Sequence, residues 1–334
     1  MRDVDLFTLE TLPLASGQVL RNAALAYRTW GALSENRDNA VLVPTFYTGT
    51  HRRNEGFFGP GRPLDPARYF IVSINLLGNG LSSSPSNTPP PQDGPRFPLV
   101  TFRDNVRAQH RLLTEHLGIR RLRLVMGWSM AACQSYQWAV QYPDLVEAIL
   151  PFCGSARTSP HNWVFLQGVK AALTADAVFA GGDYATPPVA GLRAFGRVYA
   201  GWAYSQTFFR EGHHRALGHA TPADLLDDWA EDHAANWDAN DLLAMLETWA
   251  AGDVSAGTGQ SFEATLRAIR ARATLMTCRQ DLYFPPEDTE IEAGLIPGAR
   301  LVVPDSPWGH CAASPGNDPA FLAAIDAEIA RLLS

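Results

Sequence analysis

Apolar runs bounded by turn residues recur through the first half of the chain and predict the strands of a buried sheet. The runs are residues 40–46, 68–78, 122–127 and 145–154, with helical patterns between them, most clearly at 103–117. The alternating opening stretch predicts instead an antiparallel hairpin that turns at Ala15-Ser16-Gly17. Alternating strands and helices favour an α/β fold with a mostly parallel central sheet and helices on both faces.

The pattern changes from about residue 155 to 262, where helices and loops follow one another without a clear buried strand. The alternation of strands and helices then resumes with a strand at 273–278, a helix near 287–294, a strand at 300–305 and a terminal helix. We therefore predict a core domain of residues 1–154 and 263–334 and an inserted helical lid domain of residues 155–262. Five of the nine tryptophans lie in this lid, where they either wall a pocket or pack in the lid core and at dimer contacts: Trp163, Trp202, Trp229, Trp237 and Trp249.

Composition narrows the class of protein. The chain has 334 residues, of which 46% are hydrophobic and 18% charged, and its formal net charge of -7 argues against nucleic-acid or anionic-membrane partners. Its first residues lack the basic and apolar regions of a signal peptide, and no apolar stretch is long enough to cross a membrane. We expect a soluble cytoplasmic protein.

The cysteines indicate neither a zinc site nor a disulfide framework. The four residues have no CxxC spacing and no paired histidine ligands: Cys133, Cys153, Cys278 and Cys311. Buried thiols are expected, and Cys311, next to His310, is also a candidate reactive or site-lining thiol.

The stretch LVMGWSMAACQ, residues 124–134, leaves a serine at the bend between a buried strand and a helix of small residues. Gly127 relieves crowding in such a strained turn, and small residues after Ser129 let the helix approach the sheet. Ala131 stands where the motif usually has glycine. Ser129 is a candidate nucleophile, and taken alone it is also a candidate N-cap.

Two later strand ends supply the groups that a serine nucleophile needs, a base and a residue that orients it. Asp281 follows one predicted strand and His310 follows the next, and such ends meet at one edge of a parallel sheet. The order Ser129, Asp281, His310 is that of an α/β-hydrolase triad, with the lid in the long gap. We therefore predict an α/β-hydrolase fold and this catalytic triad. Alone, the acid and base are also typical of a turn aspartate and a surface histidine, and Asp288 and Asp305 are fallback acids.

An oxyanion hole requires backbone N–H groups near the nucleophile. The N–H of Met130 follows Ser129 at a helix start, and the glycine-assisted turn 47–51 supplies the second donor. We predict Tyr47 N–H, or Thr48 N–H with a one-residue shift. The side chains of Thr48 and His51 are also expected to shape this loop.

These segments together resemble the homoserine O-acetyltransferase family of the α/β-hydrolase fold. The resemblance covers most of the chain and includes residues 39–51, 73–88, 127–149, 191–206 and the Gly-His pair at 309–310. It implies a ping-pong mechanism in which the serine takes an acyl group and passes it to a hydroxyl, and a homodimer joined through the lid. No metal or bound cofactor is needed, because the triad and the oxyanion hole suffice.

The resemblance also implies a set of residues that contact substrate. The lid arginine and tyrosine that hold the acceptor in this family correspond most nearly to Arg197 and Tyr204, which otherwise are expected in a lid salt bridge and in the lid core. Trp128, Thr48 and Cys311, adjacent to predicted catalytic or oxyanion positions, complete the predicted substrate-binding set.

Two departures from the family pattern concern the serine turn and the acceptor. The two glycines that normally follow the serine motif are Ala131-Ala132 here, and the usual Gly-His-Asp is Gly309-His310-Cys311. That aspartate is expected to hold the homoserine ammonium, and an unpaired buried ammonium costs several kcal/mol. We therefore expect an acceptor other than homoserine.

The predicted activity is acyl transfer through an acyl-enzyme at Ser129. The donor is a small acyl ester or thioester, with acyl-CoA as one candidate, and the acceptor is water or an alcohol other than homoserine. Homoserine acetylation with acetyl-CoA is the alternative enzyme activity, and a non-catalytic ligand receptor is the alternative from another class.

Overall fold

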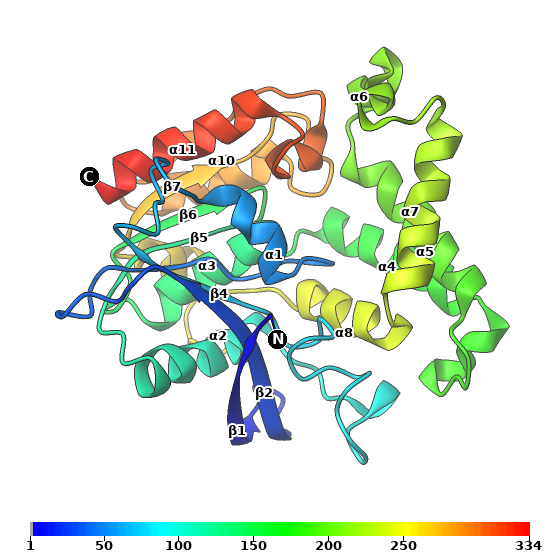
Figure 1. The fold of residues 1–334 in the computed structure, drawn as a ribbon, viewed down its shortest axis with the longest axis horizontal. Coiled ribbons are helices and arrows are strands. Elements are labelled where there is room, and N and C mark those ends of the chain that lie inside the picture. The colour runs from blue at the N-terminus through cyan, green and yellow to red at the C-terminus, as the bar shows by residue number, and fades with distance from the viewer. Residues whose placement is uncertain (1–2) are drawn as a thin grey trace.

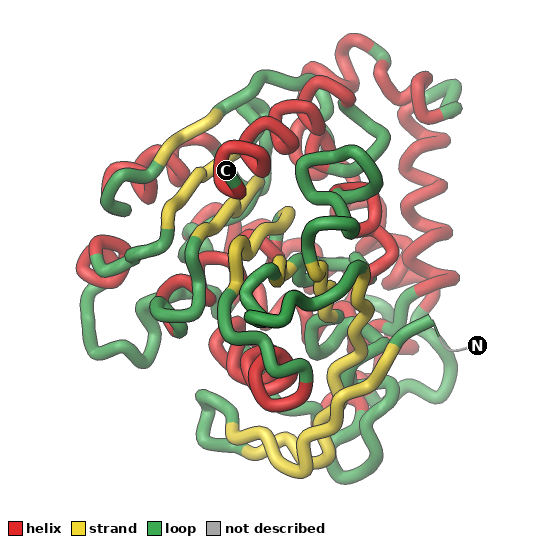
Figure 2. The backbone as a smooth tube through the Cα atoms, turned by 60° about the vertical axis from the view of Figure 1, so that its left-hand side comes forward, coloured by secondary structure: helices red, strands yellow, loops and turns green. Residues whose placement is uncertain are grey.

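The computed structural model describes residues 3–334 and arranges their strands in one sheet with helices around it (Figures 1 and 2). The strand order is β1-β2-β4-β3-β5-β6-β7-β8. β1 and β4 pair with β2 in antiparallel fashion, and all other neighbours are parallel, so the predicted hairpin and mostly parallel sheet are confirmed. The bounds are β1 Asp5–Pro13, β2 Val19–Trp30, β3 Ala40–Leu42, β4 Phe70–Ile74, β5 Leu122–Trp128, β6 Ala148–Phe152, β7 Arg272–Met276 and β8 Arg300–Val302.

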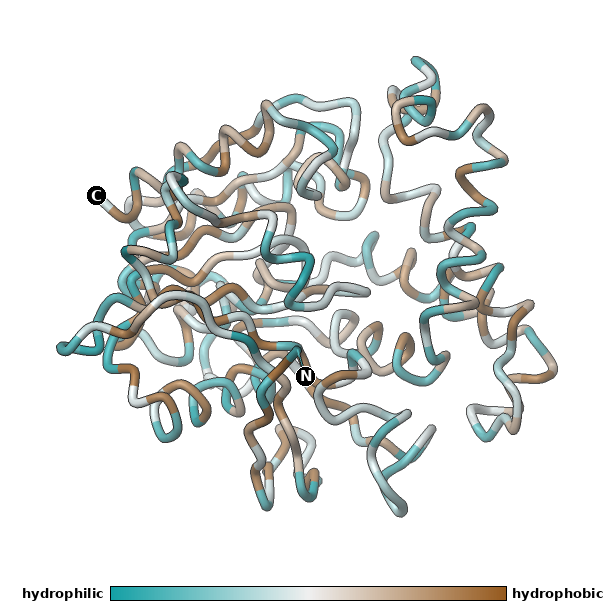
Figure 3. Tube along the Cα trace, in the orientation of Figure 1, coloured by the Kyte–Doolittle hydropathy of each residue, from teal (hydrophilic) through white to brown (hydrophobic). Residues whose placement is uncertain are grey.

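Successive strand residues face two different hydrophobic cores, which is why the strands are apolar runs. Leu124 and Leu150 belong to one core together with Phe321 of α11 (Pro319–Leu333). Val125 and Ile149 belong to the other, with residues of α2 (Phe102–Arg111) and α3 (Met130–Gln141). Figure 3 shows hydrophobic residues, in brown, along the strands of the sheet.

Two predicted strands end earlier than expected. The runs 40–46 and 300–305 form only the short strands β3 and β8, because Pro44 and Pro304 carry no N–H for the ladder. The N–H of Thr45 still donates to β4 at 3.0 Å, so the chain stays extended until it reaches the loop above the sheet. That loop enters the candidate site.

Residues 155–262 contain helices and no regular strand. In Figure 1 these helices lie together beside the sheet, and α5 packs between α4 and α7. The segment is formed by α4 Pro160–Thr174, α5 Val189–Ala203, α6 Gln206–Glu211, α7 Pro222–Asn236 and α8 Ala239–Ala250, and α9 Phe262–Arg267 begins at its end.

The remaining helices pack on the sheet: α1 His51–Asn54 contacts β4, and α10 Pro286–Leu295 contacts β7 and β8. Within residues 3–334, none of the helices combines the length and the apolar character that crossing a membrane requires.

Candidate active site

Ser129 occupies a sharp turn between β5 and α3. Its backbone adopts φ 60° and ψ -124°, a conformation that costs a non-glycine residue on the order of 1–3 kcal/mol. Close packing maintains the turn, since a Cβ on Gly127 would lie 2.3 Å from Ala131 Cβ and one on Gly154 would lie 2.6 Å from the Ser129 carbonyl oxygen. The Ser129 side chain makes no capping hydrogen bond to α3, so the N-cap interpretation finds no support. A strained strand-to-helix turn is typical of an exposed nucleophile.

His310 and Asp281 form a buried pair at the carboxyl ends of β8 and β7. Their closest contact is 2.7 Å, between His310 Nδ1 and Asp281 Oδ2, and the two side chains are 5% and 0% exposed. The other carboxylate oxygen, Oδ1, accepts the N–H groups of Tyr283 at 2.8 Å and Phe284 at 3.0 Å. Because an ionised carboxylate accepts but cannot donate, the pair places the imidazole proton on Nδ1 and leaves Nε2 free to accept.

Aromatic rings fix the plane of the His310 imidazole. Trp128 stacks on it with centroids 5.1 Å apart, and Tyr283 meets it edge-on at 4.8 Å. A ring held on two sides and by a carboxylate has little freedom to rotate, which is the arrangement that a general base requires.

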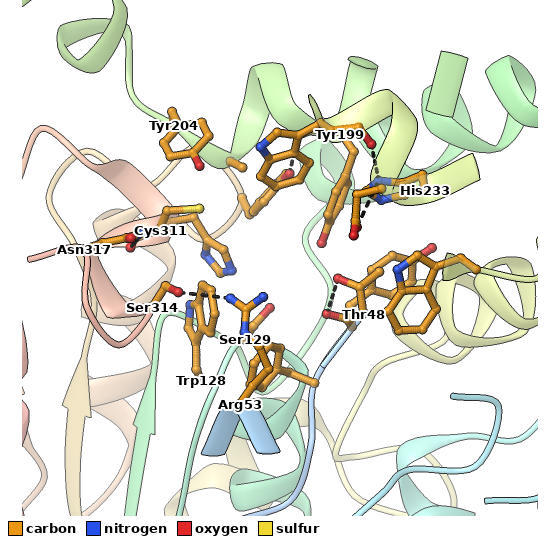
Figure 4. Close-up of a pocket in the computed structure, with 18 of the residues that line it drawn as sticks. Thr48, Arg53, Trp128, Ser129, Tyr199, Tyr204, His233, Cys311, Ser314 and Asn317 are labelled. Atoms are coloured by element: carbon orange, nitrogen blue, oxygen red, sulfur yellow. Dashed lines mark hydrogen bonds and ion pairs between the residues drawn. The ribbon is translucent and has the colours of Figure 1, made fainter. Parts of the chain in front are cut away.

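A cavity of about 380 Å³ brings most of the predicted site residues together (Figure 4). Of those predictions, its lining contains Ser129, His310, Trp128, Tyr47, Thr48, Tyr204 and Cys311. Asp281 lies behind His310 and is 3% exposed, as an orienting residue would be. The fallback acids lie elsewhere, since Asp305 binds Gln280 Nε2 at 2.9 Å and Asp288 belongs to α10.

The two backbone N–H groups predicted for the oxyanion hole have no hydrogen-bond acceptor among the described residues. Met130 is the first residue of α3, so its N–H has no intrahelical partner. The N–H of Tyr47 has no hydrogen-bond partner within residues 3–334. The Tyr47 hydroxyl donates to Leu242 O on α8 at 2.9 Å, and Thr48 Oγ1 donates to Tyr47 O at 2.8 Å, so both side chains hold the loop in place.

The two lid residues suggested by the family resemblance occupy different environments. Tyr204 lines the cavity and is 5% exposed, and its ring stacks on Phe208 with centroids 4.1 Å apart. Arg197 is absent from the cavity wall, and its guanidinium pairs with Asp227 of α7 at 2.5 Å. The lid salt bridge is therefore the interpretation of Arg197 that its position supports.

Two of the five lid tryptophans that were candidates to wall a pocket, Trp229 and Trp237, line the cavity. Three other lining residues were not found from the sequence: Tyr199 of α5, His233 of α7 and Arg53 of α1. The many tryptophans of residues 155–262 were the only sequence signal for these lining residues. They do not indicate which face of each helix points to the sheet. His233 Nδ1 donates to Trp229 O at 2.7 Å, and burial lowers the pKa of this histidine, so it contributes a neutral ring.

The groups closest to a metal-ligand arrangement are those of the buried pair plus a thiol. Ligand atoms of Cys153, Asp281 and His310 lie within 4.8 Å of one another. Burial raises the pKa of Cys153 well above its usual value, and a protonated thiol is a poor metal ligand. All four cysteines are buried free thiols, as their spacing predicts.

Burial also raises the pKa of Cys311, to about 12. The thiol therefore stays neutral at the cavity wall, where it lines the site without being a reactive thiolate. A neutral side chain stands at the position where the acetyltransferase pattern has an aspartate.

Comparison with known proteins identifies the family of this chain. The chain matches the α/β hydrolase fold family over residues 41–314. It is 39% identical to ethyl acetate hydrolase of Pseudomonas veronii, with 99% of this chain and 95% of that protein covered. It is 32% identical to homoserine O-acetyltransferase of Chlorobium chlorochromatii, with 88% and 86% covered. The structure of the acetyl esterase MekB superposes with a TM-score of 0.96 at 38% identity, covering 99% of this chain and 97% of that chain.

These similarities confirm the predicted fold class and family resemblance. They also favour an enzyme over the non-catalytic receptor, because the relatives named are hydrolases or acyltransferases. The chain belongs to the α/β hydrolase fold family, among the relatives of the homoserine O-acetyltransferases, and is a hydrolase or acyltransferase.

Proposed function

We propose that this enzyme is a serine esterase that hydrolyses acetyl esters of small alcohols through an acyl-enzyme at Ser129. The observation that carries the proposal is the convergence of the strained Ser129 turn and the buried His310–Asp281 pair on one cavity. Relatives named as an ethyl acetate hydrolase and an acetyl esterase support the substrate class.

In the proposed mechanism, Ser129 Oγ attacks the ester carbonyl while His310 Nε2 takes its proton. Asp281 stabilises the imidazolium, and the N–H groups of Met130 and Tyr47 stabilise the oxyanion. His310 then protonates the alcohol, which leaves. Water enters, gives a proton to His310 and attacks the acyl-enzyme. His310 then returns this proton to Ser129 Oγ as the bond from Oγ to the acyl carbon breaks, which releases the acid and restores Ser129.

Water is the proposed acceptor because the cavity lacks a buried anchor for an amino-acid ammonium. The neutral Cys311 replaces the expected aspartate. The carboxylates that line the opposite wall, Asp228 and Asp232, have side chains 71% and 54% exposed, so each interacts weakly with a cation. Homoserine acetylation is the less favoured activity for this reason.

One set of reactions tests the activity and the acceptor. The protein is incubated with ethyl acetate, and separately with acetyl-CoA, each with and without homoserine, and products and intact protein mass are followed. We expect acetate release from ethyl acetate that does not change with homoserine, and no release by Ser129→Ala. O-acetylhomoserine formation would establish the acetyltransferase alternative, and an active alanine variant would remove Ser129 as the nucleophile.

We further propose that residues 155–262 act as a lid domain on the core 1–154 and 263–334, and that two chains associate through it. Val164 of α4 and Val198 of α5 are 61% and 39% exposed on adjacent helices, and no atom outside its own helix approaches the Cβ position of Gly168 or Gly201 within 4 Å. Exposed apolar and small residues on packed helices favour association.

Sedimentation equilibrium should give about twice the chain mass of 36.5 kDa. Val164→Asp should yield monomer, whereas Ile291→Asp on the core helix α10, 62% exposed, should not. A monomeric wild type would contradict this assembly. We also propose a cytoplasmic location, because buried free thiols are typical of reducing compartments.

A further inference from the structure

Arg53 brings a positive charge to the wall of the active-site cavity. It lies on α1 and lines the same cavity as Ser129 and His310. Within residues 3–334, Arg53 has no carboxylate at ion-pair distance, whereas its neighbour Arg52 pairs with Asp3 at 2.5 Å. The charge of Arg53 is therefore available to a bound molecule.

Two contacts hold the Arg53 guanidinium at this wall, and Figure 4 shows the one with Ser314. One terminal nitrogen donates to Ser314 Oγ at 3.0 Å, and the group lies over the Phe46 ring, 5.9 Å from its centroid. Ser314 and Phe46 also line the cavity. A guanidinium has five N–H donors in a rigid fork that matches a carboxylate, and the Ser314 contact uses one of them.

The opposite wall of the cavity carries the opposite charge. Asp228 and Asp232 of α7 line the lid side, and both side chains are more than half exposed. An anionic group in the cavity is repelled from this side and attracted to Arg53. The charge distribution therefore selects one orientation for a substrate that carries an anion away from its ester bond.

We propose that Arg53, held by Ser314, is a specificity-determining residue that binds a carboxylate on the ester substrate. The proposal rests on the ester hydrolysis proposed above and names its substrate class: acetyl esters of small hydroxy acids. In the reaction, water adds across the ester bond and releases acetate and the free hydroxy acid, while the bound carboxylate is unchanged.

The test uses two substrates that differ in charge at one position, acetoxyacetate and acetoxyacetamide, with acetate release as the common readout. The wild type should have the higher kcat/KM for acetoxyacetate. Because Arg53 is exposed, Arg53→Gln should lower the acetoxyacetate-to-acetoxyacetamide ratio of kcat/KM by up to about fivefold, since an exposed ion pair contributes about 0.2–1 kcal/mol and 1.4 kcal/mol is tenfold. The loss should be mainly in KM.

Two further variants sharpen the result. Arg53→Lys should retain part of the preference, because it keeps the charge without the fork. Arg52→Gln, which removes the neighbouring exposed cation outside the cavity, should keep the wild-type ratio. Added salt at about 0.5 M, where the screening length is roughly 4 Å, should reduce the wild-type ratio toward that of Arg53→Gln.

The proposal is overturned if Arg53→Gln leaves the ratio at its wild-type value or if the wild type favours the amide. If no ester is hydrolysed, the proposed activity fails and binding still decides this question. Calorimetric titration of acetoxyacetate into Ser129→Ala should then show binding that the Ser129→Ala, Arg53→Gln protein lacks. Equal binding by both proteins would refute the subsite.

Discussion

Asp281→Asn replaces one atom of a carboxylate that holds three N–H groups. Oδ2 contacts His310 Nδ1 at 2.7 Å, and Oδ1 accepts Tyr283 N–H at 2.8 Å and Phe284 N–H at 3.0 Å. An asparagine oxygen at the Oδ1 position keeps both backbone hydrogen bonds. Its amide nitrogen then faces His310 Nδ1 and donates to it, so the imidazole proton moves to Nε2, the atom that must accept a proton from Ser129.

The expected loss is therefore catalytic far more than structural. An imidazole in the wrong tautomer lowers kcat by roughly 10⁴-fold in a comparable triad, which raises the barrier by about 5.5 kcal/mol. The free energy of unfolding should fall by only about 1.5–3 kcal/mol, the contribution of one charged hydrogen bond. Initial rates of ethyl acetate hydrolysis and urea unfolding measure the two effects.

Asp305→Asn is the matched control for this change. Asp305 follows the neighbouring strand and binds only the exposed Gln280 amide, at 2.9 Å. Its variant should keep nearly the wild-type rate. A folded Asp281→Asn protein with more than about a tenth of wild-type activity would refute the role of Asp281, because that loss is far below the ~10⁴-fold expected for a triad acid.

Two other changes address the turn and a buried carboxyl. Gly154→Ala would place a Cβ 2.6 Å from the Ser129 carbonyl oxygen, so activity on ethyl acetate and the free energy of unfolding should both fall, the latter by about 1–3 kcal/mol. Gly294→Ala on α10, with no atom within 4 Å, should leave activity unchanged and raise the free energy of unfolding by up to about 1 kcal/mol, and equal behaviour of the two variants would contradict the argument. Burial raises the pKa of Glu292 from 4.5 to about 7, so the stability that this group contributes is complete below pH 4.5 and lost as the pH rises through 7. The free energy of unfolding of wild type minus that of Glu292→Gln should fall by on the order of 3 kcal/mol between pH 4.5 and pH 7.5, measured by urea unfolding, and a constant difference would contradict it.

The sequence predicted the three triad candidates more completely than the other residues that line the cavity. Ser129, Asp281 and His310 follow strands that run in parallel, and the ends of parallel strands meet at one sheet edge whatever the strands' lengths. Their convergence on the cavity therefore needed only the order of elements. Arg53 and His233 could not be predicted in the same way, because a helix residue reaches the cavity only if packing turns that face inward.

The pattern of apolar residues also did not predict the lengths of the strands. The run 40–46 is apolar except for Thr45, yet Pro44 ends the regular ladder, and the chain beyond it continues toward the cavity loop. An apolar run indicates burial, and burial continues where the strand has ended: Phe46 and Tyr47 are both 3% exposed.

The two alanines that depart from the family pattern show how the serine turn tolerates them. Ala131 faces Gly127, where a second Cβ would lie 2.3 Å away, and Ala132 faces Gly154, where it would lie 2.4 Å away. Each pair has room for only one methyl group. Because the residue on or after the strand is glycine, the residue on α3 can be alanine. The substitution at Cys311 has no such compensation: it removes a charge from the cavity wall while the His310–Asp281 pair keeps its 2.7 Å contact. Packing thus preserves the Ser129 turn and the His310–Asp281 pair of the proposed triad, and the proposed acceptor side is where this chain departs from the acetyltransferase pattern.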